Sequence, residues 1–136
     1  MTYAVSEALQ KAVYTTLINA APLTSLVSGA IYDASPTGAV PGLYISLGPE
    51  EVRARNDMTG RGAEHRFTVN VVSDADGFLT AKVVAGAVCD ALQDAVPTLD
   101  RGRIVSLNFD RARARRIGLD ERRQIELRFI ARVEDN

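Results

Sequence analysis

Only a few side chains in this sequence are of types that could carry acid–base or metal chemistry. The one histidine, His65, lies between Glu64 and Arg66. A catalytic histidine needs a positioned nucleophile or an orienting carboxylate, and no serine elbow or cysteine motif accompanies this one. We therefore interpret it as an ordinary polar strand residue. The one cysteine, Cys89, lies beside the apolar side of a predicted helix, where a small core thiol is the usual interpretation.

Other catalytic patterns are weak or absent from the sequence. Glu50 and Glu51 are adjacent, but neighbours in a strand point in opposite directions, which does not suit shared acid–base work. No P-loop, dinucleotide fingerprint, zinc-protease or EF-hand pattern occurs. One histidine with one cysteine cannot build a closed zinc site. We predict no catalytic, metal-binding or cofactor-binding residues, and a protein that is not an enzyme.

The most distinctive motif is the arginine-rich run at residues 110–116. In a strand, Arg111, Arg113 and Arg115 share one face, while the two alanines between them face the helices. The partner strand places further polar residues on the arginine face: Gln124, Glu126, Arg128 and Arg132. Three interpretations stay open for this face: a solvated surface with ion pairs, a subunit interface built from arginine forks, or a DNA-contacting surface.

Composition bounds the class of protein. The 136 residues, 46% hydrophobic and 24% charged, fit one folded domain spanning 1–136. No apolar stretch approaches the length of a membrane span, and the start lacks the features of a signal peptide, so we expect synthesis in the cytoplasm. Charge is uneven: residues 1–100 have six Lys or Arg against eleven Asp or Glu, and 101–132 have ten Arg against four acids. Such asymmetry marks a nucleic-acid patch or two complementary faces of a self-assembling subunit.

Apolar periodicity predicts the elements that position these residues. Helices are expected at 5–20, with Ser6 as N-cap, at 22–27, and at 78–95. Strands are expected at 31–33, 43–47, 64–73, 103–116 and 124–133. Within 103–116, alternation places Val105, Leu107 and Phe109 on one face. The polar stretch 48–62 is predicted to be an exposed hairpin tip or loop, an arm of about residues 49–63. The fold class is α+β, a mostly antiparallel sheet with two long helices on one face.

Several segments of this layout match a known pattern across nearly the whole chain. They are residues 17–27, 31–33 with the Pro-rich connector after them, 43–48, 62–65, the Ala-rich long helix and the arginine hairpin ending at 129–133. In these the chain resembles the phage tail-completion or tail-terminator family, most closely the tail terminators of gene transfer agents. The resemblance implies a structural virion protein at the head–tail junction of a phage-like particle.

The resemblance also implies partners. Members of the family form a ring, expected here to be a homohexamer, that terminates the tail tube and joins it to the head stopper or connector, with DNA only as passing cargo and no membrane contact. On that basis the arm and the arginine hairpin become candidate subunit or partner interfaces. Their residues are Glu51, Arg53, Arg55, Asp57, Arg61, Arg111, Arg113, Arg115, Glu126 and Arg128.

Two other functions remain as alternatives. A head-completion (stopper) subunit would share the small size and the lack of catalytic motifs. A DNA-binding protein would use the arginine hairpin as a β-ribbon. The absence of Trp and the few aromatic residues weigh against a stacking platform for nucleic acid.

Overall fold

The computed structural model describes residues 3–34, 36–38, 40–55, 62–93, 97–118 and 121–135. The order of helices and strands is the predicted one, and the fold is α+β. In chain order the elements are α1 (Ser6–Ile18), α2 (Ala21–Val27), β1 (Ile31–Tyr32), β2 (Leu43–Ala54), β3 (Gly62–Ser73), α3 (Leu79–Gln93), β4 (Arg103–Ile117) and β5 (Arg122–Glu134).

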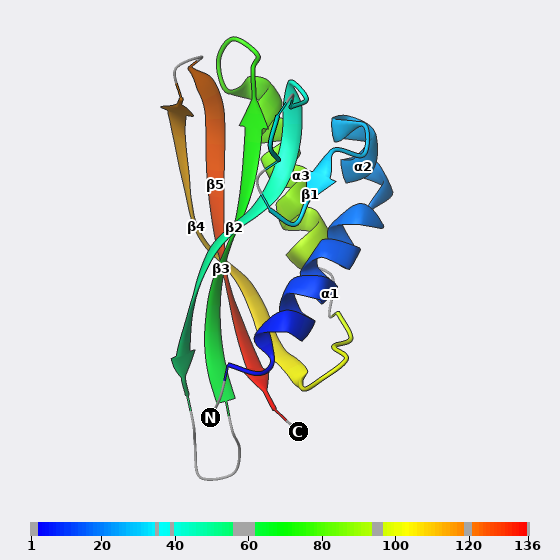
Figure 1. Cartoon of the computed structure of the whole chain (residues 1–136), viewed down its shortest axis with the longest axis vertical. Helices are drawn as coiled ribbons and strands as arrows, with labels where there is room; N and C mark the ends of the chain where they lie inside the picture. Colours follow the sequence, from blue (N-terminus) through cyan, green and yellow to red (C-terminus); the bar gives the residue numbers. More distant parts are fainter. Residues whose placement is uncertain are drawn as a thin grey trace.

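The five strands form one twisted sheet in the order β1-β2-β3-β5-β4. Strand β1 pairs with β2 in parallel, and all other pairs are antiparallel. The helices cover one face of the sheet and leave the other open (Figure 1). Because β4 comes last in the strand order, it is an edge strand. The hairpins β2–β3 and β4–β5 lie with their turns toward opposite ends of the sheet (Figure 1).

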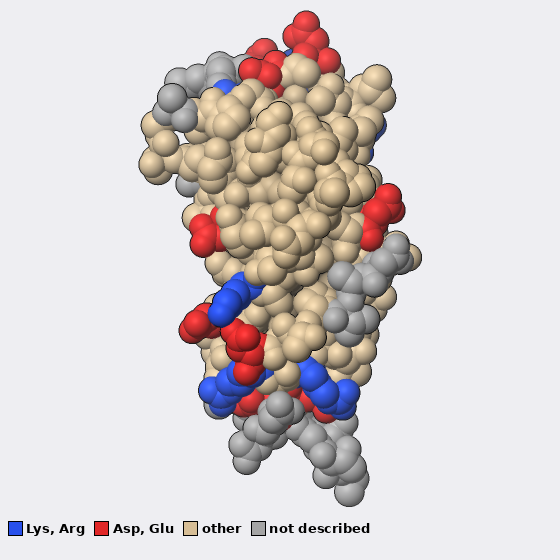
Figure 2. Space-filling view, turned by 90° about the vertical axis from the view of Figure 1, so that its right-hand side faces the viewer, with Lys and Arg blue, Asp and Glu red and all other residues tan. Residues whose placement is uncertain are grey.

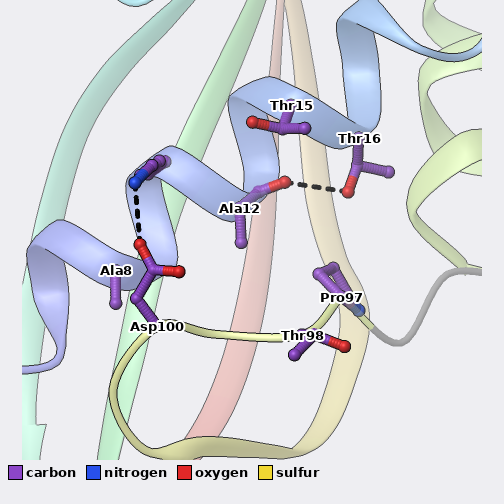
Figure 3. Close-up of a pocket in the computed structure, with 8 residues that line it drawn as sticks. Ala8, Ala12, Thr15, Thr16, Pro97, Thr98 and Asp100 are labelled. Atoms are coloured by element: carbon purple, nitrogen blue, oxygen red, sulfur yellow. Dashed lines mark hydrogen bonds and ion pairs between the residues drawn. The ribbon is translucent and has the colours of Figure 1, made fainter.

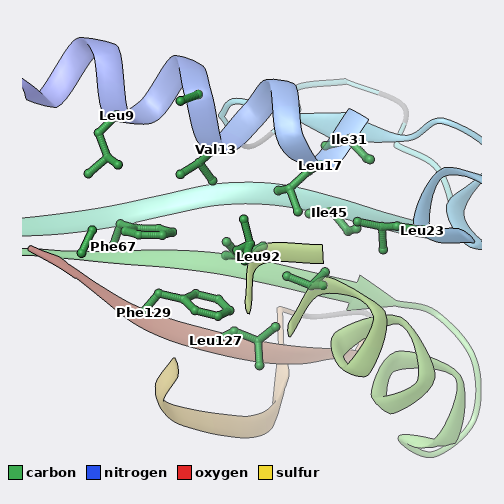
Figure 4. Packing of buried hydrophobic residues seen from close by; sticks show 14 of the residues in the cluster. Leu9, Val13, Leu17, Leu23, Ile31, Ile45, Phe67, Leu92, Leu127 and Phe129 are labelled. Atoms are coloured by element: carbon green, nitrogen blue, oxygen red, sulfur yellow. The ribbon is translucent and has the colours of Figure 1, made fainter. Parts of the chain in front are cut away.

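The core lies between the helices and the covered face of the sheet. Alternate residues of β3 and β5 form the sheet side of this core, among them Val69, Leu127 and Phe129. Helix α1 contributes Leu9, Val13 and Leu17 at the spacing of one helical face, and they point toward the strands (Figure 4). Burial of such side chains is what holds α1 on the sheet, since a helix of this length is marginal alone in water.

The start of α1 corrects one prediction. The cap position belongs to Val5, and no side chain caps the helix there. The Ser6 hydroxyl donates instead to Glu50 Oε1, 2.7 Å away on β2. Ser6 therefore ties the helix to the sheet rather than capping the helix. The predicted core stripe of α3 is confirmed at Ala81, Val84 and Leu92, with residue 95 outside the described part of the chain.

Strand β2 runs further than predicted. The sequence indicates a strand only over 43–47, followed by a polar arm, but β2 continues to Ala54 beyond a register shift between Leu47 and Glu50. Its polar half pairs with β3, with Glu51 opposite Arg66. Backbone hydrogen bonds and cross-strand charge pairs sustain this extension without the apolar alternation that sequence patterns detect. Much of the arm is therefore an antiparallel ribbon.

Candidate assembly surface

Strand β4 carries two register shifts, between Ile104 and Ser106 and between Phe109 and Arg111. Each extra residue inverts the side-chain alternation. The prediction that Val105 shares a face with Leu107 and Phe109 is therefore wrong: Val105 falls at the first shift and is 46% exposed. Leu107 and Phe109 lie opposite Ala131 and Phe129 on the covered face.

The second shift sets the phase of the arginines. Beyond it Arg111, Arg113 and Arg115 lie opposite Arg128, Glu126 and Gln124 on the open face. The alternation predicted for the arginines is thus confirmed. The intervening Ala112 and Ala114 do lie opposite the buried residues Leu127 and Ile125, yet both are exposed because β4 is the outermost strand.

We call Arg111, Arg113 and Arg115 of β4, with Arg128 of β5, the arginine ladder. No ladder residue makes an ion pair within the described part of the chain. Arg111 and Arg128 lie directly opposite each other, an arrangement of like charges that destabilises a strand pair. Among the described residues that face the ladder across the β4–β5 pairing, Glu126 is the one acid. The ladder therefore has an excess of positive charge, which Glu126 opposite Arg113 and Glu51 beside Arg128 offset only in part.

On the other half of the open face, three arginines form ion pairs with two glutamates. Arg53 Nε lies 2.8 Å from Glu51 Oε1, and Arg66 Nε lies 3.1 Å from Glu64 Oε2. Arg55 Nη2 reaches the same Glu64 carboxylate at 3.6 Å. The hydrogen bond from Arg53 lowers the pKa of the Glu51 carboxyl. These exposed pairs contribute little to stability, but they offset most of the charge on this part of the face.

The structure brings the predicted site residues of the arm and of the hairpin onto one face. Two shallow recesses of about 250 and 150 Å³ adjoin there, and both are lined by Glu126 and Arg128. Arg113 borders the first and Glu51 the second. The predictions for Asp57 and Arg61 lie outside the described residues.

His65 differs from its predicted role. Its side chain is fully buried on the covered face, and neither ring nitrogen has a hydrogen-bond partner among the described residues. Burial lowers the pKa of His65 and raises the pKa of Glu50, whose Oε2 lies 4.0 Å from His65 Nδ1. His65 lies two positions before Phe67 in β3, so both side chains point to the covered face. This spacing is the sequence signal that indicates its burial.

The cluster of Ser6, Glu50 and His65 brings together residue types that occur in hydrolases, but not in a catalytic arrangement. The Ser6 hydroxyl donates a hydrogen bond to the Glu50 carboxylate, but Ser6 is only 5% exposed, so a substrate does not reach its oxygen. The Tyr3 hydroxyl also donates to Glu50. The cluster instead fastens the start of the chain to the sheet. Sequence spacing gives no indication of it, because the residues come from three separate elements.

Two further features offer no chemistry. Burial, and to a lesser extent Asp90, raises the pKa of the Cys89 thiol, which keeps it protonated and weakly nucleophilic. A recess of about 280 Å³ lies between α1 and the loop before β4 (Figure 3). Its walls are mainly alanine and threonine. Lys11 Nζ and Asp100 Oδ2, 2.7 Å apart, form an ion pair at its edge. Within the described residues no group of three or more His, Cys, Asp or Glu could hold a metal ion.

The outer surface of the helix layer contrasts with the open face. Helix α2 has no charged residue, and none occurs anywhere in residues 12–32. Viewed from the helix side, uncharged side chains cover most of the central area (Figure 2). None of the described helices is long and apolar enough to cross a membrane.

Comparison with known proteins identifies the family of this chain. The family model described as "Tail completion protein gp17" matches residues 11–134. The chain belongs to this tail completion family. It is also similar to a chain in the solved structure entitled "Virion of native gene transfer agent (GTA) particle". The two are 53% identical with a TM-score of 0.90, and the match covers 98% of this chain and 99% of the other.

Among curated proteins none matches this chain at a significant level. The resemblance to tail-completion proteins of gene transfer agents is nevertheless confirmed by the family match and by the solved structure. The protein is thus a structural component of a phage-like tail.

Proposed function

We propose that copies of this chain form a ring, a homohexamer, that terminates the tail tube of a phage-like particle and joins it to the head connector. The observation that carries the proposal is the arginine ladder: four arginines without an ion-pair partner among the described residues, two of them directly opposite each other. Within the monomer Arg111 and Arg128 repel each other, whereas an acidic partner surface would offset the excess positive charge. The solved relative is a chain of a gene transfer agent virion, which supports a role in assembly.

The mechanism needs no chemical step. A ring seated on the end of a growing tube presents a surface that further tube subunits cannot use, and growth stops. The whole chain, residues 1–136, would act as one domain, with the tail tube protein on one side of the ring and the head stopper or connector on the other. DNA would pass through the opening as cargo. Many weak subunit contacts suffice, because a closed ring multiplies them.

The experiment that tests this function combines the purified protein with tail tubes and images the tube ends. Rings seated at a single end, and tubes that stop growing there, are the expected result. The variant Arg113→Glu with Arg115→Glu should lose the rings or their seating while its circular dichroism and thermal unfolding stay those of the parent protein. Tubes that grow unchanged in the presence of the parent protein would contradict the terminator function.

A head-completion subunit is the second candidate function. The same arginine ladder would then bind a head protein, and purified heads, not tail tubes, would retain the chain. The test therefore includes tail-free heads as a parallel sample. A DNA-binding β-ribbon protein would instead shift duplex DNA in a salt-sensitive way in the absence of any particle component.

A further inference from the structure

One recess on the helix side has carboxylates and aromatic rings, the groups that could bind the arginines of the ladder. We call it the tyrosine groove: a hollow of about 470 Å³ along α1 whose walls include Tyr3, Glu7, Gln10, Tyr14 and Asp33. Glu7 and Asp33 are exposed, and neither makes an ion pair within the described residues. The groove therefore has two carboxylates that form no ion pair among the described residues, beside two phenol rings.

The lysine at the rim of the groove is already neutralised. Lys11 also lines the hollow, but its Nζ lies 2.7 Å from Asp100 Oδ2, on the side that faces the loop before β4. This hydrogen bond is the main reason that the pKa of Lys11 is raised. Lys11 contacts Asp100 and interacts with Glu7 only more weakly, so neither Glu7 nor Asp33 has a cation in contact among the described residues.

The groove suits guanidinium groups better than other cations. Arginine forms paired hydrogen bonds with carboxylates and stacks on aromatic rings, which a lysine ammonium does not do equally well. Tyr3 is 61% exposed, so its ring is free to contact a partner side chain. Along β4 the ladder arginines recur every second residue, about 7 Å apart, a spacing that allows two neighbouring guanidinium groups to enter one hollow.

The two surfaces cannot meet within one chain. The ladder lies on the open face of the sheet, and the groove lies along α1. Helix α1 belongs to the layer that covers the other face (Figure 1). A contact between them must join different copies, with a different surface used on each side. Such a heterologous contact repeats from copy to copy and closes into a ring when the rotation between neighbours fits.

We propose that the arginine ladder of one copy, chiefly Arg113 and Arg115, docks into the tyrosine groove of the next copy and forms the repeating contact of the ring. This inference rests on the proposed ring function and names its subunit contact. The contact is electrostatic at its centre, so it weakens as salt rises to about 0.5 M, where charges are screened over a few ångströms.

The test is a charge-exchange experiment on the full chain. One variant is Arg113→Glu with Arg115→Glu, and the other is Glu7→Arg with Asp33→Arg. Each should raise the dissociation constant for self-association, measured by sedimentation and light scattering across concentration, by about tenfold or more. A chain with all four changes should recover at least part of the loss, because the charges are again complementary.

Matched controls isolate the two surfaces. Arg116→Glu reverses a charge adjacent to Arg115 on the opposite face of β4, and Asp90→Arg reverses an exposed acid of α3 outside the groove. Both should associate as the parent protein does. Each variant is also checked for its unfolding temperature, so that a loss of folding is not taken for a loss of contact.

Several results would overturn the proposed contact. If the groove variant associates normally while the ladder variant does not, the ladder binds another surface. The contact is also overturned if the chain with all four changes recovers none of the lost self-association. The same holds if the parent protein stays monomeric at all concentrations and forms no ring on tubes. If the ladder change abolishes only DNA binding, the partner is nucleic acid. Rings that cap tubes without depending on the groove would leave the terminator function intact and remove only this contact.

Discussion

The covered and the open face of the sheet can be compared most directly on β5, where the two kinds of residue alternate. Phe129 is 2% exposed and stacks on Phe67 at a ring-centroid distance of 5.5 Å. The adjacent Arg128 points to the open face, opposite Arg111. The covered face follows the ordinary requirements of a core, whereas the ladder half of the open face places like charges together at a cost to the monomer. Burial accounts for the residues of the covered face, and the proposed partner contact would account for the ladder.

The largest expected change in the free energy of unfolding comes from a substitution in the core on the covered face. Phe129→Ala should destabilise the protein by about 3–5 kcal/mol, because it opens a cavity among Phe67, Phe109 and the helices. Arg128→Ala, one residue away, should change the free energy of unfolding by no more than about 0.5 kcal/mol. Chemical denaturation of both variants measures the contrast. Equal losses would contradict the division of roles between the two faces.

A smaller effect concerns the buried polar cluster at the arm end of the covered face. His65→Leu should stabilise the protein by about 1–3 kcal/mol, because it replaces a buried ring whose nitrogens have no hydrogen-bond partner among the described residues. The measurement is denaturant unfolding near neutral pH. The control His65→Gln keeps a polar side chain at this position and should gain less. A clear loss of stability in His65→Leu would show that the histidine has a favourable partner in solution.

The same histidine predicts a dependence on pH. Because burial lowers the pKa of His65 from 6.5, the unfolded chain binds a proton more readily than the folded chain. Stability should therefore fall as the pH drops through 6.5 and stop falling below the lowered pKa of the folded state. The raised pKa of Glu50 acts in the opposite sense at lower pH, since the folded state then gains a proton more readily. Denaturant unfolding across this range measures the slope, and in His65→Leu the fall below neutral pH should disappear while the Glu50 contribution stays.

Most of the fold could be predicted from apolar periodicity, and the exceptions share a physical cause. The stripe of α1 and the alternation of β5 are properties of single segments, so the sequence alone indicates them. The shift at Phe109/Arg111 is a property of a strand pair and has no apolar signature. The alternations predicted on either side of it are out of phase, with Phe109 among odd-numbered apolar residues and Arg111 among odd-numbered polar ones. Only the pairing with β5 resolves this conflict, by placing the extra residue between Phe109 and Arg111.

The candidate site shows the same limit. The phase of Arg111, Arg113 and Arg115 follows from their spacing, but their lack of ion pairs among the described residues depends on where β2 and β3 place their acids. The charged neighbours of His65 suggest a polar strand residue, whereas its parity with Phe67 decides its burial. The tyrosine groove joins residues of α1 to Asp33 after β1 and could not be foreseen without the packing of the helix.

The smallest expected effect tests whether the ladder costs the monomer stability. Arg111→Gln removes the repulsion from Arg128 across the strand pair and should stabilise the monomer by about 0.2–1 kcal/mol. Arg115→Gln is the matched control, because its cross-strand neighbour Gln124 is neutral and no repulsion is relieved. Both changes weaken positive charge at the ladder, so both should reduce ring assembly on tubes. If only Arg111→Gln stabilises the monomer while both variants assemble less well, the arginines serve a partner at a cost to the monomer. Equal stability changes in the two variants would mean that the arginines are merely solvated.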